Sequence, residues 1–120
     1  MRDGIAWHVE LAVRPGQLEN FRALTAEMVE VTRREAGVLA YRRFVSEDGA
    51  LVYIYERYAD DAAALAHLRN FMAEFGPRFA AMVERRRFIV FGRPGGELRE
   101  MLAGFGASFA PPLGDFEYWG

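Results

Sequence analysis

The strongest constraint on the fold is a pattern that occurs twice: an alternating segment, a segment of helical periodicity, and a second alternating segment. Residues 5–13 place apolar side chains at every second position, which is typical of a strand with one buried face. From Leu18 to Val31 apolar residues recur every three or four positions, which predicts a helix ending near Ala36-Gly37 with Gly37 as its C-terminal cap. Residues 38–45 then predict a second strand.

The second half repeats this order. Residues 51–58 predict a strand that follows a turn, so the second and third strands form a hairpin. A second helix is expected to begin at Asp60 or Asp61 and to bend at Gly76-Pro77. Residues 87–91 predict the fourth strand. The order β-α-β-β-α-β predicts an α+β, ferredoxin-like domain with a four-stranded antiparallel sheet and both helices on one face.

The third and fourth predicted strands are apolar at both phases of the alternation. In residues 51–58, for example, Leu51 and Tyr53 alternate with Val52 and Ile54. An antiparallel sheet with one solvated face should instead alternate apolar and polar residues. Two helices can cover only one face of the sheet, so we expect a homodimer in which the sheet faces of two copies pack together.

The length of 120 residues suits one domain core. We therefore expect a ferredoxin-like domain over residues 1–92 and a C-terminal extension over residues 93–120. In the extension, Glu97–Ala103 predicts a short helix, and an aromatic-rich tail is expected to pack on the domain or on the dimer partner. The aromatic residues of the extension are Phe105, Phe109, Phe116, Tyr118 and Trp119.

Composition excludes several function classes. The 15 arginines are scattered among 17 acidic residues, giving a net charge of −2, so we expect no nucleic-acid partner. Cysteine is absent, which excludes thiolate chemistry and disulfides. No apolar stretch approaches the roughly 20 residues that span a bilayer, so we expect no membrane partner and a cytoplasmic location. The spacing of His8 and His67 does not suggest a metal site.

Three short motifs carry a resemblance to a known family across roughly residues 4–92. Arg14-Pro15-Gly16 follows the first strand, Glu35-Ala36-Gly37-Val38 precedes the second, and Tyr55-Glu56-Arg57-Tyr58 ends the third. An Asp/Ala-rich helix containing Ala66-His67-Leu68 comes next. In these features the chain resembles the antibiotic biosynthesis monooxygenase superfamily of dimeric α/β barrels, including its quinol-monooxygenase-like members.

This resemblance implies a pocket between the helices and the sheet. It also implies that a small electron-rich aromatic, such as a quinol or an anthrone, is oxygenated by O2 without a metal, flavin or other cofactor. Such chemistry requires a base that forms the phenolate or carbanion, and a dry, apolar cavity. The alternative is a non-catalytic dimeric module that uses the same fold to hold a small ligand or haem.

The catalytic candidates are His67 and Glu56. An imidazole titrates near pH 6.5 in water, which makes His67 the natural general base. Alternatively, His67 is a surface or dimer-contact residue. A buried Glu56 with a raised pKa could also serve as a base. Its alternative is a structural role, paired with an arginine such as Arg42 or Arg43.

The candidates for substrate binding are side chains that can stack on an aromatic ligand or form hydrogen bonds with it. They are Trp7, Tyr53, Tyr55, Asn70, Phe71 and Arg42. Core packing is the alternative for Trp7 and Phe71, and a solvated position on the hairpin is the alternative for Arg42.

Overall fold

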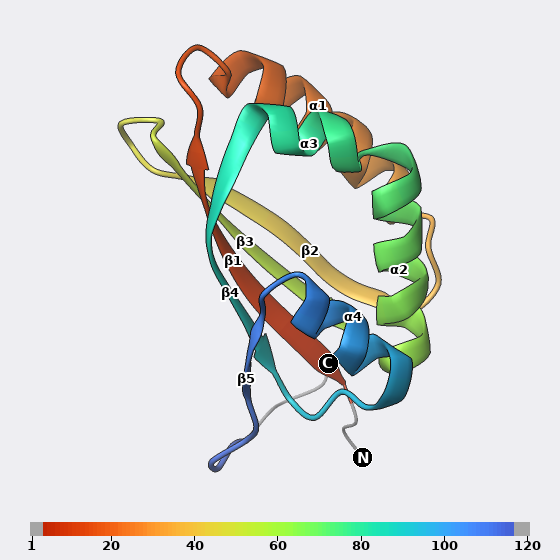
Figure 1. Ribbon diagram of the computed structural model, residues 1–120. Helices are drawn as coiled ribbons and strands as arrows, with labels where there is room; N and C mark the ends of the chain where they lie inside the picture. The colour runs from red at the N-terminus through yellow and green to blue at the C-terminus, as the bar shows by residue number, and fades with distance from the viewer. Residues whose placement is uncertain (1–3, 117–120) are drawn as a thin grey trace.

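A β-sheet with helices on one side forms the fold in the computed structural model, which describes residues 4–116 (Figure 1). The elements are β1 Ile5–Val13, α1 Leu18–Thr32, β2 Val38–Val45, β3 Leu51–Tyr58, α2 Asp61–Glu74, α3 Gly76–Met82, β4 Val83–Phe91, α4 Gly96–Gly104 and β5 Ser108–Ala110. The sheet order is β2-β3-β1-β4-β5. Within residues 4–116, no helix is long and apolar enough to cross a membrane.

The α+β, ferredoxin-like fold is confirmed, with two differences in the sheet. Strands β2, β3, β1 and β4 pair antiparallel as expected, but β5 adds a fifth strand parallel to β4. Three residues are too few to display an alternation, so the sequence pattern did not reveal β5. Strand β4 also begins at Val83, four residues before the predicted start, because Val83 pairs with Val13 at the end of β1.

The core lies between the sheet and the helices. Strand β1 turns Ile5, Trp7, Val9 and Leu11 inward, each less than one-tenth exposed. Helix α1 buries Phe21, Leu24, Met28 and Thr32 against this layer. Their spacing of three or four residues places all four side chains on one helix face, which is the face predicted from the sequence.

Gly37 brings the turn after α1 against the start of α2. Its φ is +82°, and a Cβ atom there would lie 2.6 Å from Cβ of Ala63. The Gly37 carbonyl also accepts a hydrogen bond from the Ala59 amide at 2.9 Å. Helix α1 itself ends at Thr32, so the expectation that Gly37 caps α1 is wrong. Glycine is required here for close approach between two elements.

Helix α2 begins at a side-chain cap and presents a histidine to the core. Asp60 accepts a hydrogen bond from the Ala63 amide at 2.9 Å, which satisfies one of the free donors of the first turn. The buried residues of α2 are Ala64, His67 and Leu68. The bend expected at Gly76-Pro77 is confirmed, because α2 ends at Glu74 and Pro77 lies in the first turn of α3.

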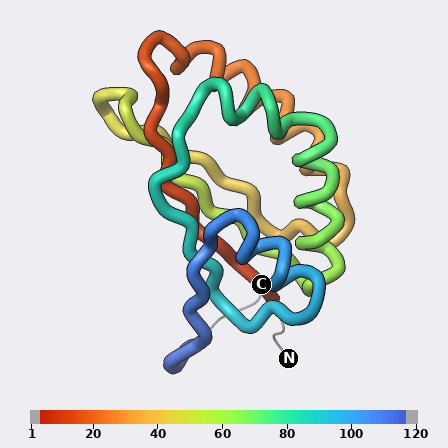
Figure 2. Tube along the Cα trace, viewed as in Figure 1, coloured from red at the N-terminus to blue at the C-terminus, as the bar shows by residue number. Residues whose placement is uncertain are grey.

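The segment after β4 turns back over the edge of the domain. Helix α4 buries Leu98 and Leu102, and β5 then runs beside β4 (Figure 2). Phe105 and Phe109 are half-buried, whereas Phe116 is 76% exposed in the single chain. The remaining aromatic residues of the tail, Tyr118 and Trp119, lie outside the described residues.

Residues 4–116 leave the sheet face opposite the helices open. His8 stacks on Tyr53 there, with ring centroids 6.2 Å apart. Phe44 and Phe91 are 47% and 42% exposed. This face combines aromatic side chains with charged ones, such as Glu10.

Candidate active site

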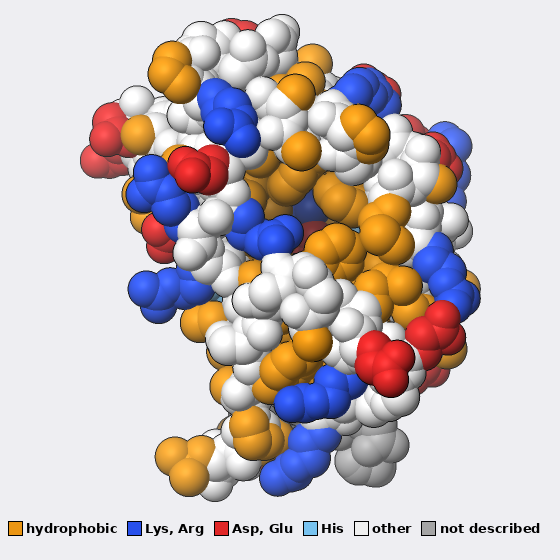
Figure 3. Space-filling model, in the orientation of Figure 1, with side chains coloured by type: hydrophobic (Ala, Val, Ile, Leu, Met, Phe, Trp, Pro, Cys, Tyr) orange, Lys and Arg blue, Asp and Glu red, His pale blue; other side chains and the backbone are white. Residues whose placement is uncertain are grey.

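A pocket opens between the inner face of the sheet and the helices. Its apolar lining includes Val9, Ile54, Leu68, Phe71, Phe79 and Phe88. The cavity has a volume of about 60 Å³ and is partly open to solvent. Figure 3 shows the hollow, with hydrophobic side chains around it and charged atoms within it. The charged side chains that line it are Arg43, Glu56 and Arg85.

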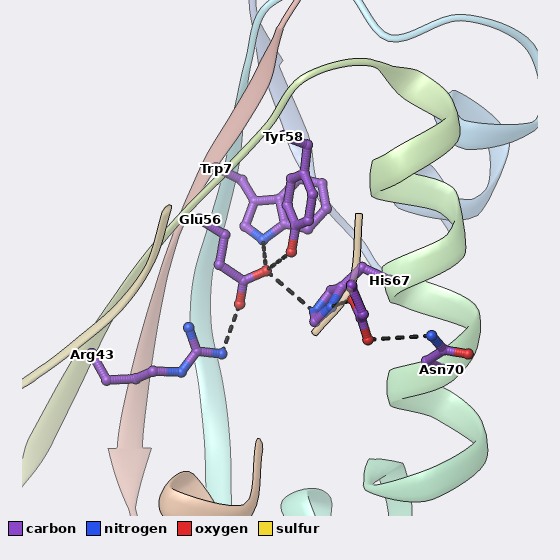
Figure 4. A network of polar contacts seen from close by, with 7 residues as sticks. Trp7, Arg43, Glu56, Tyr58, His67 and Asn70 are labelled. Atoms are coloured by element: carbon purple, nitrogen blue, oxygen red, sulfur yellow. Dashed lines mark hydrogen bonds and ion pairs between the residues drawn. The ribbon is translucent and has the colours of Figure 1, made fainter. Parts of the chain in front are cut away.

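Glu56 lies at the centre of a buried polar network (Figure 4). Its Oε1 accepts hydrogen bonds from Nε1 of Trp7 at 2.9 Å and from the Tyr58 hydroxyl at 2.5 Å. Its Oε2 accepts from Nη2 of Arg43 at 2.7 Å. A buried carboxylate is tolerated only when it is paired and hydrogen-bonded, and all of these contacts meet that need.

The charge state of Glu56 follows from this network. Burial raises its pKa, but the nearby charge of Arg43, that of His67, and the hydrogen bonds from Tyr58 and Arg43 together outweigh burial, so the pKa of Glu56 lies below its ordinary value. The raised pKa considered for Glu56 from the sequence is therefore wrong in direction. Arg43 is the arginine that pairs with Glu56, as one of the two sequence alternatives proposed.

Two tyrosines beside this network, Tyr58 and Tyr41, remain protonated at neutral pH. Burial, followed by the charge and hydrogen bond of Glu56, raises the pKa of Tyr58 well above its ordinary range. Burial raises the pKa of Tyr41 to about 12, although the Arg43 charge acts in the opposite direction. The Arg43 guanidinium carbon lies 3.4 Å from the centroid of the Tyr41 ring. Both hydroxyls therefore act as hydrogen-bonding groups at neutral pH.

His67 lies between two carboxylates. Its Nδ1 is 2.8 Å from Oε1 of Glu35, and its Nε2 is 3.6 Å from Oε1 of Glu56. The side chain of His67 is only 5% exposed. Because a carboxylate only accepts hydrogen bonds, we assign the proton of a neutral imidazole to Nδ1, which leaves the lone pair on Nε2. The Nε2 atom can then accept a proton in a pocket with an apolar lining, and the two carboxylates stabilise the resulting imidazolium.

The second oxygen of Glu35 is held by Asn70, whose Nδ2 donates to Oε2 at 3.2 Å. Asn70 itself is exposed and does not line the pocket. The contact of Asn70 with Glu35 fixes the carboxylate that orients His67. Asn70 therefore acts on the imidazole indirectly, through Glu35.

The pocket contains some of the residues expected from the sequence but not others. His67, Glu56, Trp7 and Phe71 line it. Tyr53, Tyr55 and Arg42 do not, because their side chains lie on the opposite face of the sheet. On that face Arg42 pairs in register with Tyr55, and its guanidinium carbon is 4.8 Å from the Phe44 ring centroid.

The parity of the strands explains this separation. Successive side chains of a strand point to opposite faces, so Tyr55 cannot share a face with its neighbour Glu56. The register between β2 and β3 pairs Tyr41 with Glu56 and Arg43 with Ile54. The inner face of β2 is therefore formed by Tyr41 and Arg43. Which side chains share a face could have been predicted from the hairpin sequence.

Glu35, Arg85 and Phe105 were not among the sequence candidates. Glu35 lies in the turn after α1, where helical or strand periodicity carries no information about direction. Phe105 follows α4 and lines the pocket, and its carbonyl accepts a hydrogen bond from Nη2 of Arg85. No sequence signal related these residues to His67. Within residues 4–116, no three His, Asp or Glu side chains lie close enough together to hold a metal ion.

The sheet, the helices on one face and the pocket between them define a ferredoxin-like α+β protein. The chain belongs to the antibiotic biosynthesis monooxygenase family, whose model matches residues 5–85. This match includes Glu35, Glu56 and His67 but ends before α4. A comparison with curated proteins gave no match.

Solved structures give further similarities, one of them over nearly the full length of the chain. The structure of MupZ from Pseudomonas fluorescens is similar with a TM-score of 0.87 and 26% identity, covering 98% of this chain and 91% of that one. A structure described as an antibiotic biosynthesis monooxygenase from Bacteroides thetaiotaomicron has a TM-score of 0.64 and 26% identity, covering 70% and 84%. SnoaB from Streptomyces nogalater, a cofactor-independent oxygenase, shares the fold at 14% identity, with a TM-score of 0.65 and coverage of 79% and 97%.

Proposed function

We propose that this chain is a cofactor-independent monooxygenase that oxygenates a small quinol- or anthrone-like aromatic with O2. Membership of the antibiotic biosynthesis monooxygenase family supports the reaction class. The observation that carries the proposal is the imidazole of His67, which lines the pocket while Glu35 holds its other nitrogen. SnoaB supports the proposal at the level of the fold.

The proposed role of His67 is that of general base. Nε2 accepts a proton from the substrate, and the carbanion or phenolate that forms passes an electron to O2. For an anthrone, one oxygen atom then becomes bonded to the ring carbon and the other leaves as water, so that the CH2 group and O2 give a C=O group and H2O. The imidazolium is stabilised by Glu35 and Glu56 while the substrate carries its negative charge.

The proposal is tested by oxygen uptake with a panel of naphthohydroquinones and anthrones. The wild type is expected to consume O2 with at least one of them. His67→Gln should lower that rate by about a hundredfold or more, because a positioned general base contributes about 10²–10⁴-fold. His8→Gln removes the other imidazole on the opposite sheet face and should leave the rate unchanged.

The proposed monooxygenase activity would be rejected if the wild type consumed no oxygen, or if His67→Gln consumed it at the same rate as the wild type. Tight binding of the same aromatics without turnover would then favour a ligand-binding module, and a Soret band on titration with haem would identify haem as its ligand.

We also propose that the open sheet face packs against the same face of a second copy. Aromatic side chains on this face, including Tyr53, Phe44 and Phe91, are only partly covered within one chain. Glu10 and Arg87 are paired across β1 and β4 on the same face, so both signs of charge are present. A two-fold interface brings the same patch of two copies together, and a patch with both signs of charge can pair with itself.

A further inference from the structure

Two arginines approach the pocket from different strands on the inner face of the sheet. Arg43 belongs to β2, and Arg85 belongs to β4, with β3 and β1 between them. Arg43 lies in register with Ile54 of β3, and Arg85 with Leu11 of β1. Because their neighbours in register are core residues, both stems start from the helix-covered side, and both side chains line the same cavity.

Arg43 has more donors than the protein satisfies. Its side chain is 8% exposed, and only Nη2 reaches Glu56. Its Nε and Nη1 are buried and have no hydrogen-bond partner within residues 4–116. Buried donors of a charged group are almost always satisfied, and leaving them unsatisfied is costly. Arg43 lines the pocket, so an oxygen atom of the pocket's ligand can supply the missing acceptor after a small movement of the side chain.

Arg85 carries a charge that the described part of the chain does not neutralise. It donates to the Phe105 carbonyl, and its guanidinium carbon lies 5.8 Å from the Phe105 ring centroid, but it forms no ion pair within residues 4–116. Unlike Arg43, it is exposed, so it meets solvent as well as the pocket. A positive charge in this position attracts an anion to the pocket.

The negative groups around the pocket do not cancel this preference. Both oxygens of Glu56 are already occupied by donors from Trp7, Tyr58 and Arg43. Glu35 lies behind His67 and is held by that residue and by Asn70. The rest of the lining is mainly aromatic and aliphatic, which suits an apolar body.

We propose that the ligand of this pocket is a small aromatic carboxylate, whose acidic oxygens interact with Arg43 and Arg85 while its ring occupies the apolar lining. The planar fork of an arginine matches the geometry of a carboxylate. This inference rests on the proposed function only in assuming that the substrate binds in this pocket. It adds the chemical class of that substrate.

Calorimetric binding of 2-naphthoic acid and 2-naphthamide tests the inference without turnover. The two probes have the same rings, but only the acid is ionised at about pH 7, since carboxyl groups titrate near pH 4. The wild type should bind the acid about tenfold more tightly than the amide. Arg43→Lys and Arg85→Met should each reduce this ratio, whereas Arg42→Met, on the opposite face, should preserve it.

Each other outcome overturns the inference. Equal affinity of the wild type for acid and amide rejects the carboxylate while leaving a ligand pocket, and thus the proposed function, in place. A preference for the acid that persists in both arginine variants rejects Arg43 and Arg85 as its cause. If neither probe binds, the carboxylate class is rejected, and oxygen uptake decides the proposed function separately. The wild-type comparison requires no variant, so it holds even if Arg43→Lys folds poorly.

Discussion

Nδ1 of His67 lies 2.8 Å from Oε1 of Glu35, a residue 32 positions earlier in the chain. The contact joins the turn after α1 to the middle of α2. It fixes the imidazole ring and directs Nε2 toward Glu56. The base of the proposed reaction is therefore oriented by a residue that does not line the pocket.

Glu35→Gln should slow the reaction without abolishing it. A glutamine at this position can donate as well as accept, so it no longer fixes the proton on Nδ1, and it removes a charge that stabilises the imidazolium. We expect kcat to fall by about tenfold or more, a part of the 10²–10⁴-fold that a general base provides. KM should stay close to the wild-type value, because Glu35 does not line the pocket. Glu30→Gln, an exposed change on α1, is the control. A kcat equal to that of the wild type would exclude Glu35 as a positioning residue.

Glu56→Gln should destabilise the protein. The variant leaves the charge of Arg43 buried without its partner, and breaking a buried ion pair costs about 3–5 kcal/mol. Urea unfolding measures this loss. Glu97→Gln breaks an exposed ion pair with Arg69 and should cost at most about 1 kcal/mol. Equal losses in the two variants would contradict the structural role of Glu56.

The same carboxylate should make stability depend on acid pH. The pKa of Glu56 is lowered by folding, so the unfolded chain binds more protons than the folded one as the pH falls below about 4.3. The stability that Glu56 contributes is therefore present above this pH and is lost as the pH falls through its folded pKa. Urea midpoints measured across the acid range should decline more steeply in the wild type than in Glu56→Gln. Parallel curves would refute this assignment.

Gly37→Ala should disturb the site from a distance. The added Cβ would meet Cβ of Ala63 at 2.6 Å and would push the turn that carries Glu35 away from α2. We expect lower stability and lower kcat. Gly16→Ala provides a matched control, because Gly16 also has a positive φ, of +77°, but a Cβ there would meet nothing within 4 Å. The Gly16→Ala variant should lose about 1–2 kcal/mol of unfolding free energy through backbone strain and should retain its activity. Equal kcat values in the two variants would count against this link.

Phe105→Ala should widen the pocket on the side of the C-terminal extension. The variant should gain affinity for three-ring ligands relative to one-ring ligands, as measured by calorimetry with neutral phenols. Phe109→Ala removes a ring of the same extension that does not line the pocket, so its size preference should match that of the wild type. An unchanged preference in Phe105→Ala would show that this ring does not limit ligand size.

Tyr53→Glu should convert the proposed dimer into a monomer. The change places a charge on the open sheet face beside His8, where desolvation in an interface is costly. Light scattering during size-exclusion chromatography should give a mass of two chains for the wild type and a mass of one chain for the variant. Arg22→Glu, on an exposed part of α1, should remain dimeric. A monomeric wild type would refute the dimer directly.

The periodicity of the sequence predicted most of the fold because burial on one face leaves a regular trace in a strand or helix. The strands over 5–13, 38–45 and 51–58 agree with β1, β2 and β3. The end of α1 was less accurate, because Gly37 serves a close contact with Ala63 and not a helix cap. Contacts between distant elements leave no periodic signal.

The candidate site was predictable only in part for the same reason. His67 was found because Ala66-His67-Leu68 resembles a family motif and an imidazole titrates near neutral pH, and Glu56 because it lies at the end of an apolar strand. Tyr55 was placed in the pocket although it follows Ile54, whose side chain faces inward, so strand parity alone would have excluded it. The contact of Glu35 with His67 depends on how a turn meets a helix, and only three-dimensional structure reveals it.

Phe105 lies beyond residues 5–85, the part of the chain that the family model matches. The wall that it forms and the imidazole of His67 therefore lie in separate stretches of the chain. MupZ matches this chain over 98% of its length, whereas the Bacteroides structure matches 70%. A change confined to the terminal segment can therefore alter the wall of the pocket while His67 and its contact with Glu35 stay in place.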